Sequence, residues 1–169
     1  MKEELITLLT ASLPISELRG AIPLAYLSFK FPLWKAYLIS VIGNLLPLLP
    51  LLFLIEKIEK IIQKLPLLKN FYSVYKKRIL RNKEIIEKYE AFGLFLFVMM
   101  PLPVTGGWTG TFLSVLFGLE KKYAIFAIIG GVCAAGIIVS LILVASVKYS
   151  ILSGILIALL IYLILSKIK

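Results

Sequence analysis

The sequence predicts an all-α integral membrane protein made of two inverted repeats, and three observations lead to this fold class. The chain is 60% hydrophobic with a mean hydropathy of +0.99, which is more apolar than a soluble domain requires. Its charges are separated by long uncharged runs, each near or above the roughly 20 residues that a helix needs to cross a bilayer. Proline and glycine interrupt two apolar segments near their middle. The uncharged runs cover residues 36–55, 91–119, 123–147 and 149–166.

Each repeat is predicted to consist of a re-entrant helical hairpin and a transmembrane helix. In the first repeat, residues 1–55, the hairpin covers 5–29 and the transmembrane helix covers 34–55. Each arm of the hairpin would be about 13 Å long if helical, which is half of a hydrocarbon core about 30 Å thick. The turn, 13–20, contains proline, glycine and two charged residues. We expect it at mid-membrane beside a cavity, because irregular backbone at that depth needs protein or water around it.

The second repeat, residues 91–147, follows the same plan. Its hairpin, 91–119, carries no charge and contains two prolines and three glycines between residues 101 and 110. So many helix breakers prevent a straight helix. The transmembrane helix of this repeat covers 123–147, and one extra C-terminal transmembrane helix is predicted over 149–166.

Short sequence matches relate the two halves. Residues 13–16 (Leu-Pro-Ile-Ser) align with 102–105 (Leu-Pro-Val-Thr), and 41–44 align with 128–131, at offsets of 89 and 87 residues. A hairpin plus one crossing leaves the chain on the opposite side, so two successive units would point in opposite directions, as in many secondary transporters. The alternative is chance similarity between apolar sequences.

The linker between the repeats, residues 56–90, is basic and amphipathic. It holds ten of the 19 Lys and Arg residues, interleaved with apolar residues near helical spacing. This predicts helices at the cytoplasmic membrane interface, the alternative being a solvated extension of the first span.

Charge also distinguishes two topologies. Re-entrant hairpins would place fourteen basic residues on one face and four on the other, whereas two full crossings would give twelve and six. The positive-inside rule favours the re-entrant arrangement, in a multi-pass protein of the cell membrane with the linker and C-terminus in the cytoplasm. Because the basic residues flank predicted spans, the net charge of +10 does not indicate nucleic-acid binding.

Glu17 and Arg19, in the first turn, are the leading functional candidates. An unpaired ionised group at the centre of a membrane helix costs about 2.5–3.5 kcal/mol on insertion scales. Such residues usually face a cavity and mark a path for substrate or protons. The alternative is an ion pair that only holds the turn together.

The second turn, residues 101–110, has no charge and is predicted to form a neutral part of the substrate site. Its glycines permit close backbone approach, its threonines add hydroxyls, and the following arm would present helix N-terminal amides that favour anions. A polar residue inside the first span is a further candidate, facing either the cavity or a neighbouring helix. The predicted substrate- or ion-binding residues are Glu17, Arg19, Gly20, Asn44, Thr105, Gly106, Gly107, Trp108 and Thr109.

Other chemistry is not indicated by the residues. The chain has no histidine, and its single cysteine, Cys133, lies in an apolar run, where an inert thiol is expected. No cluster has metal-ligand spacing, no nucleophile–base pair is visible, and no phosphate-loop sequence occurs. We therefore expect no cofactor, no metal and no enzymatic activity.

The two turns resemble known signatures. Residues 13–23 (Leu-Pro-Ile-Ser-Glu-Leu-Arg-Gly-Ala-Ile-Pro) resemble the first signature of the small multidrug export protein family, and residues 101–110 resemble the second. That family looks distantly similar to the DedA superfamily, whose members are implicated in moving polyprenyl-phosphate or other lipids through paired re-entrant hairpins. The resemblance implies that Glu17 is the acidic hairpin residue and Arg19 its basic neighbour. It departs from DedA proteins in having no charge within 91–119, where they usually carry further acidic and basic groups.

These patterns together predict a secondary transporter that moves an amphipathic or lipid-like substrate through a cavity at the hairpin tips. Proton or cation coupling through Glu17 is expected, and a homodimer would help to enclose the cavity. The alternatives are a DedA-like flippase or scramblase for polyprenyl-phosphate or phospholipid and, from another class, a non-transporting membrane scaffold.

Overall fold

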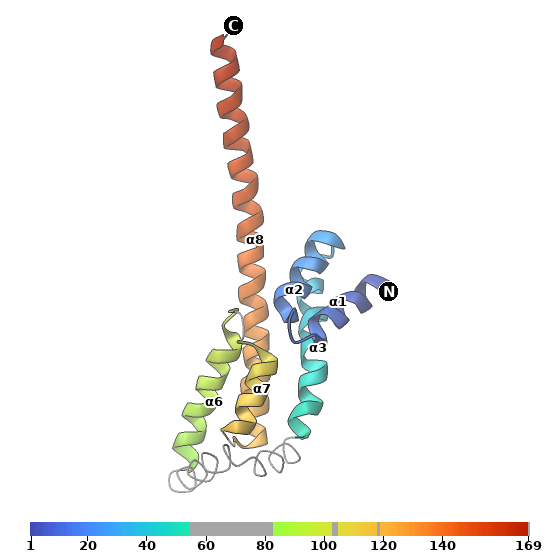
Figure 1. Cartoon of the computed structure of the whole chain (residues 1–169), viewed down its shortest axis with the longest axis vertical. Helices are drawn as coiled ribbons and strands as arrows, with labels where there is room; N and C mark the ends of the chain where they lie inside the picture. Colours follow the sequence, from blue (N-terminus) through green and yellow to red (C-terminus); the bar gives the residue numbers. More distant parts are fainter. Residues whose placement is uncertain (55–82, 103–104, 118, 169) are drawn as a thin grey trace.

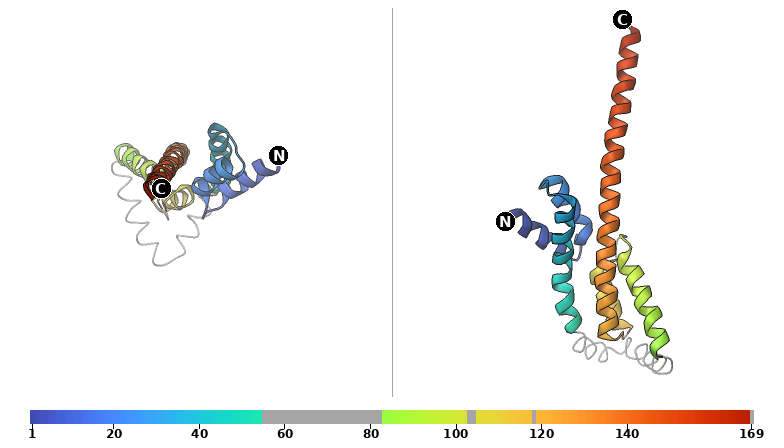
Figure 2. Two further views of the ribbon diagram at one scale, coloured as in Figure 1. Left: turned by 90° about the horizontal axis from the view of Figure 1, so that it is seen from above. Right: turned by 180° about the vertical axis from the view of Figure 1, so that it is seen from behind.

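The computed structural model describes residues 1–54, 83–102, 105–117 and 119–168, and this part of the chain is helical without β-strands. Each half contains two shorter helices around a break, followed by a long helix (Figure 1). The long helices, α3 (Leu33–Phe53) and α8 (Lys121–Ile168), pack together and run in opposite directions (Figures 1 and 2). The all-α class is therefore confirmed, with the same order of elements in both halves.

The first half begins with α1 (Lys2–Ser12) and α2 (Glu17–Pro23). Helix α1 ends because Leu13 precedes a proline, and a residue in that position favours the extended conformation that Leu13 adopts (φ −76°, ψ 138°). A π-helical turn, η1 (Leu24–Ser28), continues α2. The break is thus shorter than the predicted turn, and the charged residues of that turn lie on α2.

The second half begins with α6 (Lys83–Met99) and α7 (Gly107–Leu116), which pack against each other. Helix α6 starts before Ala91, so the last part of the predicted linker belongs to this helix. The rest of the linker lies outside the described residues. In Figure 1 both breaks lie at a middle level of the bundle, beside α3 and α8.

Helix α8 differs from the prediction of two spans separated at Lys148. It is one continuous helix of 48 residues, about 72 Å long, which is more than twice the thickness of a hydrocarbon core. Neither proline nor glycine lies next to Lys148, and lysine is itself a good helix former, so nothing local reverses the chain there. The last part of α8 therefore extends beyond the other helices, and the end of α8 lies on the opposite side of the bundle from its start (Figure 1).

Helices α1 and α3 approach each other closely at Gly43. A Cβ on Gly43 would lie 2.5 Å from the Leu8 carbonyl oxygen, so only glycine allows this contact. The Ser12 hydroxyl lies 2.7 Å from the carbonyl oxygen of Gly43 and 2.9 Å from that of Leu8. At the other end of α1, the Lys35 ammonium lies 2.6 Å from the Glu4 carboxylate.

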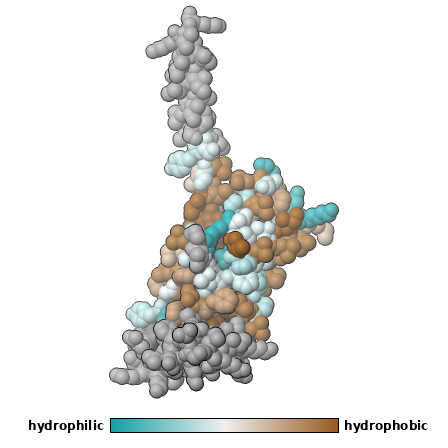
Figure 3. Space-filling model, viewed as in Figure 1, coloured by the Kyte–Doolittle hydropathy of each residue, from teal (hydrophilic) through white to brown (hydrophobic). Residues whose placement is uncertain are grey.

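Polarity is arranged as expected for a protein in lipid, with large apolar side chains outside and polar ones inside. On α3, Leu38, Ile42 and Leu46 follow each other at four-residue spacing and are 47–56% exposed. Apolar side chains also cover much of the face seen in Figure 3. The buried polar residues are Thr7, Glu17, Ser40, Asn44, Thr111, Ser114 and Ser140.

Two helical stretches of the described chain are long and apolar enough to cross a membrane. These are Leu33–Phe53, with a mean hydropathy of 2.0, and Lys121–Ser150, with 2.7. The first of the predicted transmembrane helices and the first part of α8 thus have the expected length and composition.

The contact at Gly43 can be tested by substitution. Gly43→Ala is expected to lower the free energy of unfolding by about 1–3 kcal/mol, because its Cβ would collide with the backbone of α1. Gly93→Ala is the matched control, since no described atom lies within 4 Å of its added Cβ. Thermal unfolding in detergent micelles measures both. Equal melting temperatures for the two variants would contradict the packing of α1 on α3.

Candidate functional site

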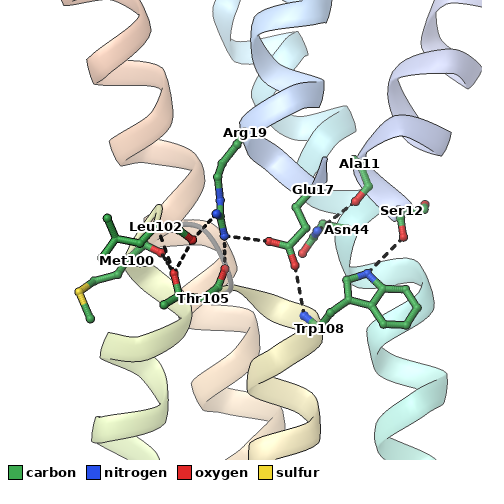
Figure 4. Close-up of polar contacts among 9 residues, drawn as sticks. All are labelled: Ala11, Ser12, Glu17, Arg19, Asn44, Met100, Leu102, Thr105 and Trp108. Atoms are coloured by element: carbon green, nitrogen blue, oxygen red, sulfur yellow. Dashed lines mark hydrogen bonds and ion pairs between the residues drawn. The ribbon is translucent and has the colours of Figure 1, made fainter. Parts of the chain in front are cut away.

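The two breaks meet at one polar cluster inside the bundle (Figure 4). Glu17 and Arg19 come from the first turn of α2, Thr105 and Trp108 flank the start of α7, and Asn44 comes from the middle of α3. The Glu17 side chain is therefore in direct contact with a backbone N–H 91 residues away in the sequence.

The carboxylate of Glu17 is buried, with the residue only 7% exposed. Its Oε1 accepts a hydrogen bond of 3.3 Å from the backbone N–H of Trp108, in the first turn of α7. A helix N-terminus favours negative charge, so α7 stabilises the ionised carboxylate. The backbone of Glu17 has φ +44°, a left-handed conformation that is uncommon for a non-glycine residue and carries strain.

Arg19 links the two breaks. Its guanidinium donates hydrogen bonds to the backbone carbonyl oxygens of Leu102 and Thr105, both in the second break. One of its nitrogens lies 3.4 Å from Oε2 of Glu17, longer than a tight charged hydrogen bond of about 2.7–2.9 Å. Arg19 therefore bonds neutral carbonyl groups of the second break, and its pairing with Glu17 is loose.

The second break is held by its own hydrogen bonds as well. The Thr105 hydroxyl lies 2.6 Å from the Met100 carbonyl oxygen and 2.8 Å from that of Leu102, and it accepts a bond of 3.2 Å from the Leu102 N–H. Because a hydroxyl has one proton, it donates to one of the two carbonyls at a time. Thr105 thus presents its side chain to its own turn and its carbonyl oxygen to Arg19.

Two glycines in the second break, Gly106 and Gly107, lie in contact with polar side chains that leave no room for a Cβ. Gly106 has φ +143°, and a Cβ there would lie 2.1 Å from Oε2 of Glu17. A Cβ on Gly107 would lie 2.9 Å from Oδ1 of Asn44 and 2.3 Å from Cδ1 of Leu48. The absent side chains let the start of α7 lie directly on the carboxylate and the amide.

Two further hydrogen bonds join the site to the end of α1. The Trp108 indole N–H donates to the Ser12 carbonyl oxygen over 3.2 Å, and the Asn44 amide donates to the Ala11 carbonyl oxygen over 3.0 Å. The last carbonyls of a helix have no partner within it. Trp108 and Asn44 therefore satisfy the end of α1 as well as line the site.

The cavity at this cluster is small in the present conformation. It has a volume of about 10 Å³, roughly the space of one water molecule. Glu17, Arg19, Asn44 and the glycine pair form part of its lining, and the rest is largely apolar, including Val98 of α6 and Val132 of α8. A drug-sized ligand needs about 300 Å³ or more, so the site is closed.

Most of the predicted site residues come together here, but two do not. Gly20 and Thr109 neither line the cavity nor belong to the polar cluster, and the nearest contact of a Cβ on Gly20 would be 2.8 Å to Cβ of Ser16 on the preceding turn. Thr105 and Trp108 belong to the cluster through their hydrogen bonds and do not line the cavity. The predicted anion site at the α7 N-terminus is occupied by the carboxylate of Glu17. Sequence reasoning also missed the backbone carbonyls of Ala11, Ser12 and Leu102, for which side-chain identity gives no signal.

The matched region of a known family contains this polar cluster. Residues 17–138 match the family model described as "putative small multi-drug export protein", which is more than half of the chain. The chain belongs to this family. Membership confirms the resemblance found in the two turn sequences, and it agrees with the membrane-type distribution of polar and apolar side chains. No curated protein and no solved structure matches the chain.

The family match begins at Glu17 itself. It therefore includes the charged pair, Asn44 and the whole second break, while the carbonyls at the end of α1 lie before it. All the residues that line the cavity lie within the matched region except Val139, which directly follows it.

A double substitution tests the packing of the glycine pair. Gly106→Ala is expected to lower the free energy of unfolding by about 1–3 kcal/mol from the strain of a non-glycine residue at φ +143°, with a further loss from the collision with Glu17. The further loss should disappear in a Glu17→Ala background, because the colliding carboxylate is then gone. Thermal unfolding of both single variants and the double variant measures the coupling. Strictly additive effects would contradict contact between these residues.

Proposed function

We propose that this protein is a secondary membrane transporter that moves an amphipathic substrate past the meeting point of the two breaks. The observation that carries the proposal is the buried Glu17 carboxylate, held by Arg19 and by the start of α7 within an apolar bundle. Ionisable groups at such depth are costly and usually mark a transport path. The family's export description agrees with this reading.

The proposed topology places both breaks near the middle of the bilayer, as re-entrant hairpins of inverted repeats. Helices α1 and α7 have 11 and 10 residues, so each is about 15–16 Å long, half of a hydrocarbon core. The opposite directions of α3 and α8 support an inverted relation of the two halves (Figure 1). The basic linker favours the cytoplasm for the end where α3 finishes and α8 begins. The continuous α8 extends away from that end. We therefore propose a cytoplasmic location for the linker and no longer for the C-terminus.

Transport requires the closed site to open, and Arg19 is the contact that must change. Arg19 belongs to α2, beside the first break, and its guanidinium donates to carbonyl oxygens of the second break. Separating the two breaks therefore removes these hydrogen bonds. We propose that the charge state of Glu17 controls this step, because an ionised Glu17 attracts Arg19 and a neutral one does not. Glu17 is then the coupling carboxylate.

A lipophilic cation is the substrate class that this geometry favours. Arg19 is already engaged with carbonyl groups and the α7 N-terminus already binds Glu17, so an anionic substrate would have to displace groups of the protein. A cationic substrate would compete for Glu17, whose pairing with Arg19 is loose at 3.4 Å.

A flippase for lipid phosphates, as in DedA proteins, is the second candidate. One observation favours it: the Arg19 side chain is 28% exposed, so its guanidinium could exchange carbonyl oxygens for phosphate oxygens when the breaks separate.

Glu17→Gln is expected to reduce export of a lipophilic cation from proteoliposomes to the level of protein-free vesicles. The amide keeps the shape of the side chain and removes its titratable charge. Glu4→Gln is the matched control, because Glu4 precedes the predicted hairpin at residues 5–29 and its carboxylate lies 2.6 Å from the Lys35 ammonium, away from the site. Unchanged cation export in Glu17→Gln would contradict the coupling role.

Arg19→Ala separates the two substrate classes. If lipophilic cations are carried, this variant retains cation export with altered rate, because the link between the breaks is weakened and Glu17 is kept. If lipid phosphates are carried, transfer of a fluorescent phosphate lipid between leaflets is lost. Arg19→Lys keeps the charge without the two-pronged contact and reports which property matters. A protein that folds normally and moves neither substrate in any variant or in the unsubstituted form would be a scaffold instead.

A further inference from the structure

The side chain of Asn44 has one buried oxygen atom that takes part in none of the hydrogen bonds of the site. The residue is only 1% exposed, and its amide nitrogen donates to the Ala11 carbonyl oxygen over 3.0 Å. Because a carbonyl oxygen only accepts, this bond fixes the orientation of the amide, with Nδ2 toward α1 and Oδ1 toward α7. Within the described residues Oδ1 has no hydrogen-bond partner.

This oxygen belongs to the cavity that Glu17 also lines. The cavity volume of about 10 Å³ is at the lower limit for one water molecule, and the space has polar groups of both residues in its lining. Buried polar atoms without a protein partner are commonly satisfied by an ordered water. The size and the unpartnered oxygen therefore point to the same kind of ligand.

The surrounding charges decide between a water molecule and a metal cation. Arg19 lies 3.4 Å from Glu17, and the α7 N-terminus adds positive character through the Trp108 N–H. A sodium ion would place another positive charge beside both. The rest of the lining, contributed by α2, α6, the second break and α8, carries no charged side chain.

We propose that the cavity holds a single water molecule that donates to Asn44 Oδ1 and contacts the Glu17 carboxylate, and that this water makes Glu17 a site for protons rather than for metal cations. In the step that follows, the water receives a proton from the aqueous side as hydronium and passes it to one carboxylate oxygen. An O–H bond forms on Glu17, its negative charge is neutralised, and neutral water is left in the cavity.

Asn44 is a positioning residue in this scheme, because it holds the water and does not itself take the proton. The assignment of the proton as the coupling ion rests on the proposed transport function, whereas the water site does not. Protonation of Glu17 would also remove the attraction that draws Arg19 toward it.

Infrared difference spectroscopy of the purified full-length protein in lipid nanodiscs tests the proposal without any substrate. A carboxylic acid band that titrates with pH is expected in the unsubstituted protein and absent in Glu17→Gln. A water O–H band that shifts when the heavy oxygen isotope replaces the normal one is expected as well, and it should be lost in Asn44→Leu. Replacing choline chloride by sodium chloride should leave the titration of the acid band unchanged.

Ser40→Ala is the matched control, since Ser40 is a buried polar residue one turn earlier on α3 whose hydroxyl also lacks a partner among the described residues, and it does not line the cavity. It should keep both bands. If Asn44→Leu fails to fold, Ala135→Val provides a second route, because its added methyl groups fill the cavity and leave the Asn44–Ala11 hydrogen bond in place. This variant should also lose the water band.

Two results would overturn the proposal. The first is an isotope-sensitive water band that persists in both cavity variants, which would place the water elsewhere. The second is a shift of the titration of the Glu17 acid band when sodium replaces choline, which would show a metal-cation site. Failure of the proposed function has a different signature. In that case no substrate moves in proteoliposomes, while the acid and water bands behave as expected.

Discussion

The burial of one carboxylate organises the interior of this protein. An ionised Glu17 among apolar helices is stable only if hydrogen-bond donors and positive charge reach it, because its side chain is buried away from solvent. Those groups come from two distant parts of the chain, Arg19 on the same helix and the first N–H groups of α7. The two breaks must therefore meet, and the long helices α3 and α8 pack around the place where they do.

The same constraint explains the unusual backbone on both sides of the carboxylate. Glu17 has a left-handed conformation, and it faces Gly106 and Gly107, which have no side chains to occupy the space of the Glu17 and Asn44 oxygens. Strain and lost side-chain packing are both costly, and such costs are tolerated mainly at functional sites. The glycines do not simply permit a tight turn, because Gly106 makes room for the Glu17 carboxylate and Gly107 for Leu48 and the Asn44 amide.

The charged groups of the closed site already have partners within it, and this limits what the site can bind. The α7 N-terminus, which would otherwise attract an anion, already holds the protein's own carboxylate, and Arg19 already holds two carbonyl oxygens. An incoming ligand must replace an existing contact, and the longest of these is the 3.4 Å pair between Glu17 and Arg19. In the proposed function, the charge of Glu17 therefore links ion binding to separation of the two breaks. Membership of the family described as putative small multi-drug export proteins agrees with the proposed transport function.

Local sequence properties determined the helical membrane class, the position of both breaks and the identity of the charged pair. Long apolar runs, prolines such as Pro14 and Pro101, and an isolated Glu17 act through neighbouring residues alone, so a single sequence is enough to read them. The continuity of α8 past Lys148 was missed because a charged residue inside an apolar run was taken as a boundary, although nothing there breaks a helix. Only the tertiary structure decided that Arg19 bonds the carbonyls of Leu102 and Thr105, that Asn44 caps α1, and that α7 holds Glu17. These pairings join groups 33 to 91 residues apart, and several use backbone oxygens that every residue carries, so packing of the helices and not residue identity selects them.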